Sequence, residues 1–411
     1  MSPRSEMVDL LASRQKFFSL PQPFYNDPAL YELDLKGIWE RQWIFAGPSC
    51  QIPEPGDYFT LTIGRSSILV LRDRTRTIRA FYNTCRHRGS KLCETERGRL
   101  SSIVCPYHQW TYDFTGKLRY AGRMHQTFDG SQYGLVPVHL ETVGGQIYIS
   151  LADEPPDFAT YKTTLGPYLA PHDLANAKPA HVAHLVEKGN WKLVMENSRE
   201  CFHCATGHPE LARSFITEYS VSELTELPGV EALWRRCAEL GLPYADSERR
   251  PGGNFRIMRL PLLEGAVSIT MDGKPAVKKL LGHIPSGDIG SVRWPHYPST
   301  FNHVLGDYAF FFRMLPTGPE ETLVTGYWLV DREAEEGRDY DLQNLIKVWD
   351  ETNLQDRDLV ERNQRGVNSL GYRPGPYSQE SENGVIAFVE WYCETMTKFL
   401  GGKGRKIARV A

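Results

Sequence analysis

The feature that most constrains this chain is a pair of short Cys/His clusters. Cys85-Arg-His87 is followed, after seventeen intervening residues, by Cys105-Pro-Tyr-His108. Zinc accepts two cysteines and two histidines, but a zinc finger places the cysteines in one pair and the histidines in the other. A mixed-ligand [2Fe–2S] cluster needs two cysteines on one iron and two histidines on the other. Because each loop here offers one of each, the spacing predicts such a cluster, with a structural zinc ribbon as the alternative.

The chain around these clusters has the pattern of a small all-β domain. Short β-branched runs alternate with turn residues, as expected for strands. Gly89 and Pro106 suit tight turns that aim backbone N–H groups at the sulfides. Such hydrogen bonds raise the reduction potential of a cluster. The expected strands are residues 58–62, 67–71, 77–82 and 145–150.

Length and composition predict a two-domain α+β protein. A chain of 411 residues is too long for one ordinary core, and 41% hydrophobic with 24% charged residues is typical of folded domains. We expect an N-terminal helical segment, 1–40, that packs on the last domain, an all-β iron–sulfur domain, 41–155, and a mixed domain, 156–411. In the last domain, strands at 182–186, 307–313 and 322–330 should form an antiparallel sheet, with helices at 191–206 and 340–365 packed on it.

Charge and hydropathy exclude several partners and locations. A net charge of −3 gives no reason to expect nucleic acid or an anionic membrane as a partner. The first twenty residues lack the apolar core of a secretory signal, and no run approaches the roughly 18 apolar residues of a membrane span. We therefore expect a cytoplasmic protein. Its eight cysteines are not expected to form a disulfide framework, and the clustered ones are better explained as metal ligands.

A second candidate metal site lies in residues 190–209, which begin with a helix-capping Asn and end in Gly-His-Pro. Glu200 and His203 are three residues apart and would share one helix face. His208 lies off that face in a regular helix, so we expect the helix to break at Gly207 and let His208 turn back. Two histidines then need a carboxylate from elsewhere to complete a facial triad for non-haem Fe(II).

The expected helix 340–365 can supply this carboxylate. An acid on a buried helix face is costly unless it is paired or bound to a metal. Asp356 falls on the apolar stripe of this helix, so it is a candidate iron ligand. From the periodicity alone, a buried Asp bonded to a helix cap stays an alternative, and Asp358 competes for the ligand role. The stripe consists of Leu342, Leu345, Ile346, Trp349 and Val360.

The motif Cys201-Phe-His-Cys204 permits a different chemistry. A Cys-x-x-Cys pair can be a redox dithiol or half of a zinc knuckle. No second cysteine pair accompanies it, and a redox dithiol usually stands at a helix start after a strand. The iron interpretation of His203 is therefore favoured.

Together these motifs resemble the oxygenase subunits of Rieske non-haem iron oxygenases. The resemblance covers about residues 25–400 and is carried by CRHRG, CPYHQWTY, NWKLVMENSRECFHCATGHPEL and TNLQD. It implies a Rieske domain followed by a catalytic domain in which an antiparallel sheet grips a long helix. It further implies mononuclear Fe(II) at His203, His208 and Asp356, with electrons from NAD(P)H supplied by a separate flavin and iron–sulfur reductase.

The resemblance also gives Glu200 a catalytic role. The matching acid bridges a cluster histidine of one subunit, here His108, and an iron ligand of the next subunit, here His203. This requires a head-to-tail ring, most simply a homotrimer. The chain departs from the common pattern at Phe202, where Tyr is frequent, and at Glu200, where many ring-dihydroxylating members have Asp.

Within the family, three segments are similar to the quaternary-ammonium branch: ENSRECFHCATGHPEL, WDETNLQDRDLVERNQRGVNS and PGPYSQESENGVIAFVEWY. The nearest resemblance is to stachydrine (proline betaine) demethylases and glycine betaine monooxygenases. It implies an O₂-dependent oxidative N-demethylation that releases formaldehyde, with stachydrine favoured and glycine betaine next. The alternatives are an aromatic-ring hydroxylating oxygenase and, outside enzymes, a Rieske electron carrier.

A pocket for such a substrate has two chemical requirements. A quaternary ammonium cannot donate a hydrogen bond, so it should meet aromatic faces, each worth about 0.5–2 kcal/mol. A betaine carboxylate also needs a donor, for which Asn302, His303 or an arginine are candidates. The aromatic candidates are Phe202, Trp294, Tyr297, Phe301, Tyr308 and Phe310.

Overall fold

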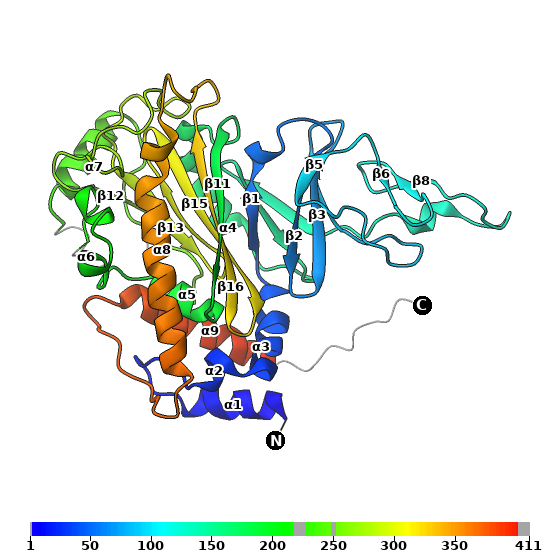
Figure 1. The fold of residues 1–411 in the computed structure, drawn as a ribbon, viewed down its shortest axis with the longest axis horizontal. Helices are drawn as coiled ribbons and strands as arrows, with labels where there is room; N and C mark the ends of the chain where they lie inside the picture. Colours follow the sequence, from blue (N-terminus) through cyan, green and yellow to red (C-terminus); the bar gives the residue numbers. More distant parts are fainter. Residues whose placement is uncertain (1, 218–226, 248–251, 402–411) are drawn as a thin grey trace.

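The computed structural model describes residues 2–217, 227–247 and 252–401 (Figure 1). The last ten residues of the expected 156–411 domain therefore lie outside the described residues. An all-β part forms one end of the molecule, and a larger sheet with its helices forms the other (Figure 1). Mixed helices and antiparallel sheets confirm the predicted α+β class.

Three small antiparallel sheets build the all-β part. In spatial order, the first contains β4 (Ile78–Tyr82), β3 (Ser66–Arg72), β2 (Asp57–Ile63) and β5 (Arg97–Arg99). The second contains β1 (Ile44–Pro48), β10 (Gln146–Ser150) and β9 (His139–Val143). The third, at the far end from the large sheet, contains β6 (Ile103–Val104), β7 (Thr111–Tyr112) and β8 (Leu118–Tyr120) (Figure 1).

A six-stranded antiparallel sheet forms the centre of the other part. Three of its strands correspond to the predicted segments 182–186, 307–313 and 322–330, although the second strand begins one residue later, at Tyr308. The other three were not predicted. In spatial order the strands are β11 (Lys178–Glu187), β16 (Glu321–Val330), β15 (Tyr308–Gly318), β14 (Thr300–Val304), β13 (Ser291–His296) and β12 (Met258–Leu260).

The register of this sheet gives one face a row of functional side chains. His303 pairs with Arg293 on β13 and with Phe310 on β15. Directly paired residues of antiparallel strands point to the same side, so all three face one way. Phe301 and Phe312 also pair with each other and, being two residues along their strands, share that face.

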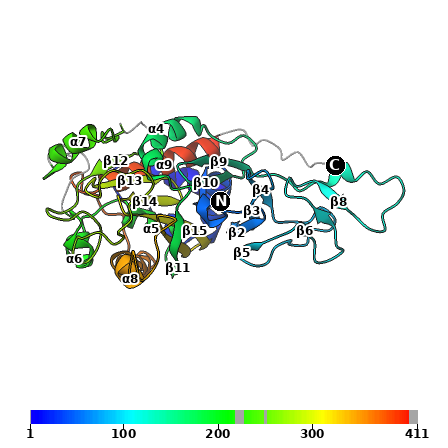
Figure 2. The same cartoon turned by 90° about the horizontal axis from the view of Figure 1, so that it is seen from above.

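The helix α8 (Leu342–Val367) lies across this face, as Figures 1 and 2 show. It begins where the side chain of Asp341 accepts a 2.8 Å hydrogen bond from the backbone N–H of Asn344, a standard N-cap. Trp349 stacks on Phe310 with 4.7 Å between ring centroids, which fixes the helix on the sheet. The predicted helix 340–365 is thus present, shifted by two residues at each end.

The N-terminal helices pack beside α5 (Trp191–Asn197) and α9 (Asn383–Gly401). Their junction contains a buried ion pair between Asp34 and Lys192, and Tyr392 donates a 2.6 Å hydrogen bond to the same carboxylate. The remaining helices are α1 (Pro3–Ser13), α2 (Pro23–Asn26), α3 (Pro28–Asp34), α4 (Ala159–Leu169), α6 (Cys204–Gly207) and α7 (Val230–Glu239). Within the described ranges, no helix is both long and apolar enough to cross a bilayer.

Candidate metal centres

The two Cys/His clusters form loops with the same backbone hydrogen bonds. The N–H of Cys85 donates to the carbonyl of Ser90, and the N–H of Cys105 donates to the carbonyl of Trp110, each at 2.8 Å. In both loops the fourth residue after the cysteine has a positive φ: +79° at Gly89 and +61° at Gln109. The two loops are therefore near copies that face each other, although the sequence spacings of their ligands differ.

Burial separates the two kinds of side chain in these loops. Cys85 and Cys105 are buried, whereas His87 is half-buried and His108 is exposed. The two Nδ1 atoms of the histidines lie 3.2 Å apart. A single zinc ion would bring all four side chains around one point, but here thiol lies with thiol and imidazole with imidazole. This arrangement fits a cluster with one buried, cysteine-bound iron and one outer, histidine-bound iron.

Tyr112 contacts the buried end of this site. Its hydroxyl accepts a 3.1 Å hydrogen bond from the N–H of Arg86 and lies 3.3 Å from Sγ of Cys85. Because the backbone N–H is the donor in the first contact, the phenolic proton is available to the sulfur. Burial first, and then the hydrogen bond with Cys85, raise the pKa of Tyr112, so the phenol stays a donor at physiological pH.

At the second site the predicted helix 191–206 is wrong in its length. Asn190 caps the helix as expected, its side chain accepting from the N–H of Lys192 at 3.0 Å. The helix α5 then ends at Asn197, where Ser198 Oγ donates to the carbonyl of Met195 at 2.9 Å and competes with helix continuation. Residues 198–203 form a turn before the short helix α6.

Glu200 holds this turn together. Its carboxylate accepts from the backbone N–H of Phe202 and, at 3.4 Å, from that of His203. Its other oxygen lies 2.5 Å from Nδ1 of His203. Glu200 and His203 are thus brought together by a local turn and not by a shared helix face. The predicted break at Gly207 is confirmed, because α6 ends there and His208 has non-helical dihedral angles.

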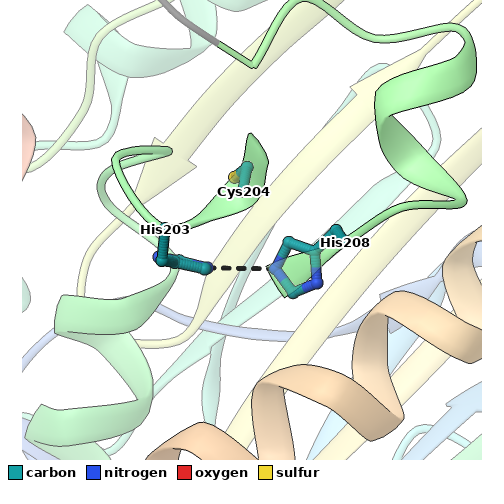
Figure 3. A group of neighbouring side chains, drawn as sticks. All are labelled: His203, Cys204 and His208. Carbon is teal, nitrogen blue, oxygen red and sulfur yellow. Dashed lines mark hydrogen bonds between the residues drawn. The ribbon is translucent and has the colours of Figure 1, made fainter. Parts of the chain in front are cut away.

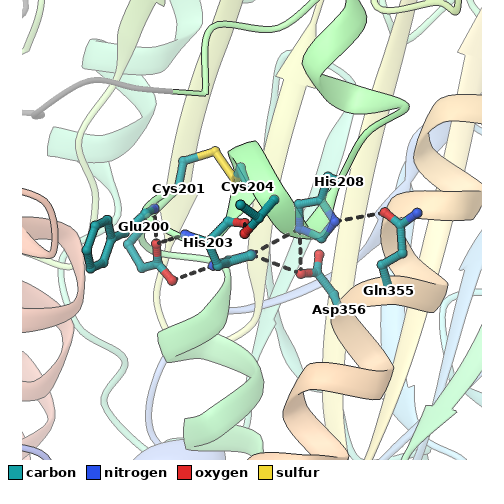
Figure 4. Close-up of a disulfide and its surroundings, with 9 residues drawn as sticks. Glu200, Cys201, His203, Cys204, His208, Gln355 and Asp356 are labelled. Carbon is teal, nitrogen blue, oxygen red and sulfur yellow. Dashed lines mark hydrogen bonds and ion pairs between the residues drawn. A yellow bond between two sulfur atoms is a disulfide. The ribbon is translucent and has the colours of Figure 1, made fainter.

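The imidazoles of His203 and His208 meet at this point (Figure 3), and the carboxylate of Asp356 joins them there (Figure 4). Nε2 of His203 lies 3.0 Å from Nε2 of His208. Oδ1 of Asp356 lies 3.3 Å from the first and 3.0 Å from the second of these nitrogens. Asp358, the competing candidate, is exposed and pairs with Arg357 at 2.9 Å. The structure therefore brings Asp356, and not Asp358, to the two histidines.

Two hydrogen bonds determine which imidazole nitrogens carry protons. Nδ1 of His203 meets the Glu200 carboxylate, and Nδ1 of His208 lies 2.9 Å from Oε1 of Gln355. The amide of Gln355 is oriented by its second bond, in which Nε2 donates to Glu210 at 2.7 Å. Carboxylate and amide oxygens accept hydrogen bonds, so both Nδ1 atoms are donors. In neutral imidazoles both Nε2 atoms are then acceptors.

The convergence point consequently needs a positive charge. Two Nε2 acceptors and the buried Oδ1 of Asp356, which receives no hydrogen bond from the described residues, would otherwise face one another. Burial lowers the pKa of His203, but the carboxylates of Asp356 and Glu200 outweigh it and raise that pKa to about 10. Without a metal a proton meets this demand. Two histidines and one carboxylate are the ligand set of mononuclear Fe(II), so the residues fit that ion.

Cys201 and Cys204 are joined by a disulfide beside this site (Figure 4). One bridge between neighbouring cysteines is not the disulfide framework that the sequence argued against, but the interpretation of clustered cysteines as metal ligands is wrong for this pair. The turn held by Glu200 brings their Cα atoms to 4.9 Å, within the range that a disulfide requires. Because these two sulfurs are bonded to each other, the candidate metal ligands of this segment are the imidazoles.

A cavity of about 150 Å³ lies against these three side chains. This is below the roughly 300–1,000 Å³ typical for drug-sized ligands. Of the predicted pocket residues, Trp294, Tyr297, Phe301 and His303 line it, although the indole of Trp294 turns to the far face of the sheet and bonds Tyr161. Tyr308 and Phe310 belong to the core under α8, and Phe202 is 70% exposed. Asn302 also lies outside the cavity lining.

Several residues of this site were not predicted. Gln355 and Glu210 could have been noticed, because Gln355 directly precedes Asp356 and Glu210 lies two residues after His208. Arg199 likewise directly precedes Glu200, whereas Arg293 had no comparable signal because a strand distant in the sequence brings it to the cavity. The lining residues that the sequence did not indicate include Arg199, Phe215, Phe255, Arg293, Phe312 and Trp349.

Comparison with known proteins matches both parts of the chain. Residues 42–138 match the Rieske [2Fe-2S] domain, and residues 174–398 match the ring hydroxylating alpha subunit (catalytic domain) family. The chain is 48% identical over 398 residues to the glycine betaine monooxygenase oxygenase subunit of Chromohalobacter salexigens, with 96% of this chain and 89% of that one covered. The corresponding subunit of Pseudomonas aeruginosa is 46% identical over 413 residues, with 99% and 96% covered.

A solved structure supports the same fold. A quaternary ammonium Rieske monooxygenase, for which carnitine oxidation and inter-subunit electron transfer are described, aligns with a TM-score of 0.72. The alignment covers 94% of this chain and 98% of that one at 22% identity. At this identity the likeness establishes the arrangement of the two domains and not the substrate.

Proposed function

The chain belongs to the Rieske non-haem iron oxygenases as an oxygenase subunit, and on this premise we propose that it removes an N-methyl group from a betaine. A betaine is a quaternary ammonium compound that also carries a carboxylate. The observation that carries the proposal is the small cavity beside His203, His208 and Asp356, which combines aromatic rings with buried arginines. The names of the two relatives that align over nearly the full length of this chain point to the same class of substrate.

Two substrates are proposed within this class. Glycine betaine is supported by the names of the relatives from Chromohalobacter and Pseudomonas. Stachydrine is supported by the motif resemblance and presents the same two charged groups, with a carbon atom between them. Phe312 and Trp349 form a corner of the cavity, with centroids 5.9 Å apart and planes at 87°. Such a corner can contact the methyl groups of either substrate through cation–π attraction.

The metal ligands are proposed on the geometry described above. Cys85, His87, Cys105 and His108 would hold the [2Fe–2S] cluster. The triad of His203, His208 and Asp356 would hold Fe(II). When bound, these groups supply electron transfer and O₂ activation, and the protein supplies position and exclusion of water.

The overall reaction balances as a monooxygenation. One atom of O₂ enters an N-methyl C–H bond, and the other leaves as water after the uptake of two electrons and two protons. The resulting hemiaminal breaks its C–N bond to give formaldehyde and the demethylated amine. The role of the chain is to hold the methyl group beside the triad, and the buried cavity wall excludes bulk water from it.

We further propose that electrons reach this site from a neighbouring subunit. Glu200, bonded to Nδ1 of His203, would meet the exposed His108 of the next subunit in a homotrimer. The similar solved enzyme with described inter-subunit electron transfer supports this arrangement. A separate flavin and iron–sulfur reductase would reduce the cluster, since the relatives are oxygenase subunits of multi-component enzymes by name.

The test is a product assay with a family reductase, NADH and O₂. Glycine betaine, stachydrine, carnitine and choline are compared by formaldehyde release and by mass spectrometry of the amine. Formaldehyde from glycine betaine or stachydrine is the expected result, and no formaldehyde from any betaine would refute the proposal. The substrate with the highest kcat/KM identifies the betaine.

Two other functions give different results in the same experiments. An aromatic-ring oxygenase would form cis-diols from arenes, which the buried arginines of the cavity do not favour. An electron carrier would hold about two irons per chain, whereas the oxygenase should hold about three, from the ligand sets above.

A further inference from the structure

The cavity has two buried cationic groups in its wall. These are the guanidinium groups of Arg199 and Arg293, both less than 10% exposed. Near the triad, burial and the neighbouring Asp356 raise the pKa of the buried Glu187, so its carboxyl group does not offset them. A cavity with two buried guanidinium groups suits a ligand that carries an anionic group.

The region of Arg293 is built around an aromatic surface. Its guanidinium carbon lies 3.9 Å from the ring centroid of Phe215, and Nη2 donates to the carbonyl of Pro261 at 3.2 Å. The planar group is thus held in one orientation on a buried wall. Stacking on the ring stabilises its positive charge, which does not contact bulk water. A second stack of this kind lines the cavity, where Arg199 lies 4.2 Å from the centroid of Phe301.

His303 lies between these two stacks. Its ring centroid is 4.6 Å from that of Phe301 and 5.8 Å from that of Phe215. Burial, Arg293 and Arg199 together keep the pKa of His303 well below its usual value, so the imidazole is neutral and carries one N–H. In the tautomer in which the hydroxyl of Ser291, 3.5 Å away, donates to Nδ1, the N–H of the imidazole is on Nε2. Among the described residues, Nε2 has no hydrogen-bond partner although it is buried.

We propose that Arg293 and His303, supported by Arg199, bind the carboxylate of the substrate. The inference rests on the proposed betaine demethylation and names the residues that select betaines over other quaternary ammonium compounds. A carboxylate offers acceptors to both a guanidinium fork and an imidazole N–H. The carboxylate would accept a hydrogen bond from the buried N–H of His303, whereas choline or tetramethylammonium would leave that N–H unsatisfied.

The position of this subsite also sets the direction in which the substrate binds. The ring of His303 lies 4.5 Å from that of Trp349. Trp349 and Asp356 are seven residues apart on α8, which is about 10 Å at a rise of about 1.5 Å per residue. A carboxylate at His303 therefore directs the ammonium group of a short betaine along the helix toward the triad. Its methyl groups would then lie beside the triad, near Glu187 and Asp356.

The test separates the carboxylate from the cation by using three ligands. Glycine betaine carries both groups, choline carries only the cation, and 3,3-dimethylbutyrate carries only the carboxylate on a neutral isostere. Dissociation constants are measured by calorimetry on the iron-loaded protein without O₂ or reductant, so binding is read independently of turnover. Arg293→Gln and His303→Phe remove the two donors, and the second keeps the ring. Arg313→Gln, a buried arginine on the opposite face of the same sheet, is the matched control.

The wild type is expected to bind both carboxylate ligands. Arg293→Gln should weaken both by about 10- to 100-fold, as expected for a hydrogen bond to a charged group. His303→Phe should weaken both by a smaller factor, and neither variant should change the affinity for choline. In the control variant the preference for betaine over choline should be that of the wild type.

Two results would overturn the inference. One is that neither carboxylate ligand binds to the wild type. The other is that Arg293→Gln and His303→Phe leave the betaine-to-choline preference intact. If 3,3-dimethylbutyrate binds and responds to Arg293→Gln while no betaine is demethylated, the carboxylate subsite stands and the proposed function fails. If Arg293→Gln does not fold, the His303→Phe result decides.

Discussion

Nδ1 of His208 and Oε1 of Gln355 are joined by a 2.9 Å hydrogen bond. Gln355 is in turn anchored to Glu210, so this imidazole is held in one tautomer with its lone pair on Nε2. Groups that orient a metal-binding histidine in this way typically change metal affinity 10- to 100-fold when they are removed.

Gln355→Leu should therefore lower the affinity for mononuclear Fe(II) by about 10- to 100-fold. The Rieske absorbance should be unchanged, because the cluster loops lie in the other part of the molecule (Figure 1). Iron titration of the chelator-treated protein measures the affinity. Gln343→Leu makes the same change at an exposed position of α8 and should have no effect. Equal affinities in both variants would contradict the orienting role.

Asp356→Ala should lose the mononuclear iron and keep the cluster. The substitution removes the one carboxylate that the structure places within 3.3 Å of both histidines. Asp358→Ala, two residues along the same helix and exposed, should retain about three irons per chain on the ligand counts above. Iron analysis with the visible spectrum distinguishes the two pools. Loss of iron in the Asp358 variant instead would reverse the assignment.

Glu200→Gln should keep both metal centres and slow turnover on the order of 100-fold, the loss expected when a reacting pair is misplaced. The amide of the glutamine accepts a weaker hydrogen bond from Nδ1 of His203 than the carboxylate does. The rate at which the reduced cluster is reoxidised in the presence of substrate and O₂ reports this step directly. The exposed Glu380 provides a control as Glu380→Gln. Unchanged reoxidation would reject the bridging role of Glu200.

Tyr112→Phe should lower the reduction potential of the cluster. The hydroxyl contacts Sγ of Cys85 at 3.3 Å, and a hydrogen bond to a cluster sulfur favours the reduced state. One such bond, worth about 0.5–1.5 kcal/mol, corresponds to roughly 20–60 mV for one electron. A spectroscopic redox titration measures the shift. Tyr120→Phe, an exposed tyrosine on β8, should leave the potential unaltered.

Glu196→Gln should change how stability depends on pH. Burial raises the pKa of Glu196 from 4.5 to about 7, although Tyr25 and Tyr377 donate hydrogen bonds to the carboxylate. The folded state thus binds this proton more tightly than the unfolded state, so the contribution of Glu196 to stability falls as pH rises from about 4.5 to about 7. Above that range the lost stability is roughly 3 kcal/mol.

The measurement is chemical unfolding of the wild type and of Glu196→Gln at pH 5 and pH 8. A glutamine can accept from Tyr25 and donate to Tyr377, so the variant keeps the packing without the titration. Its stability relative to the wild type should be higher at pH 8 than at pH 5. Parallel pH profiles for the two proteins would show that Glu196 is not the titrating group.

The sequence brought out the candidate metal ligands more readily than the structure around them. Cys85, His87, Cys105 and His108 could be recognised as candidate ligands because they lie in two short clusters along the chain. Asp356 could be separated from Asp358 only partly, since both lie near one stripe of a helix and only the tertiary structure brings one of them to His208. The candidate ligands that lie close together in the sequence were therefore predictable from local patterns, whereas the choice of Asp356 needed the tertiary structure.

The cavity-lining strand β13 could not be recognised for a physical reason. All six residues of β13 are buried, so the alternation of polar and apolar residues that marks a strand is absent. Arg293 in that strand looks like a surface residue in the sequence, and its burial depends on stacking with Phe215 from a distant segment. The length of α5 was overestimated because the side chains of Ser198 and Glu200 bind backbone groups and end the helix early.

The buried contact of Asp34 with Lys192 and Tyr392 has a consequence for biosynthesis. Lys192 is fully buried, and leaving such a charge without its partner is strongly unfavourable. Asp34 precedes the iron–sulfur part in the sequence, and Tyr392 belongs to α9, the last helix of the described residues. The ribosome must therefore release almost the whole chain before this junction can close, while the iron–sulfur part can fold during synthesis as an insertion. Cluster loading can thus precede completion of the iron site on the same polypeptide.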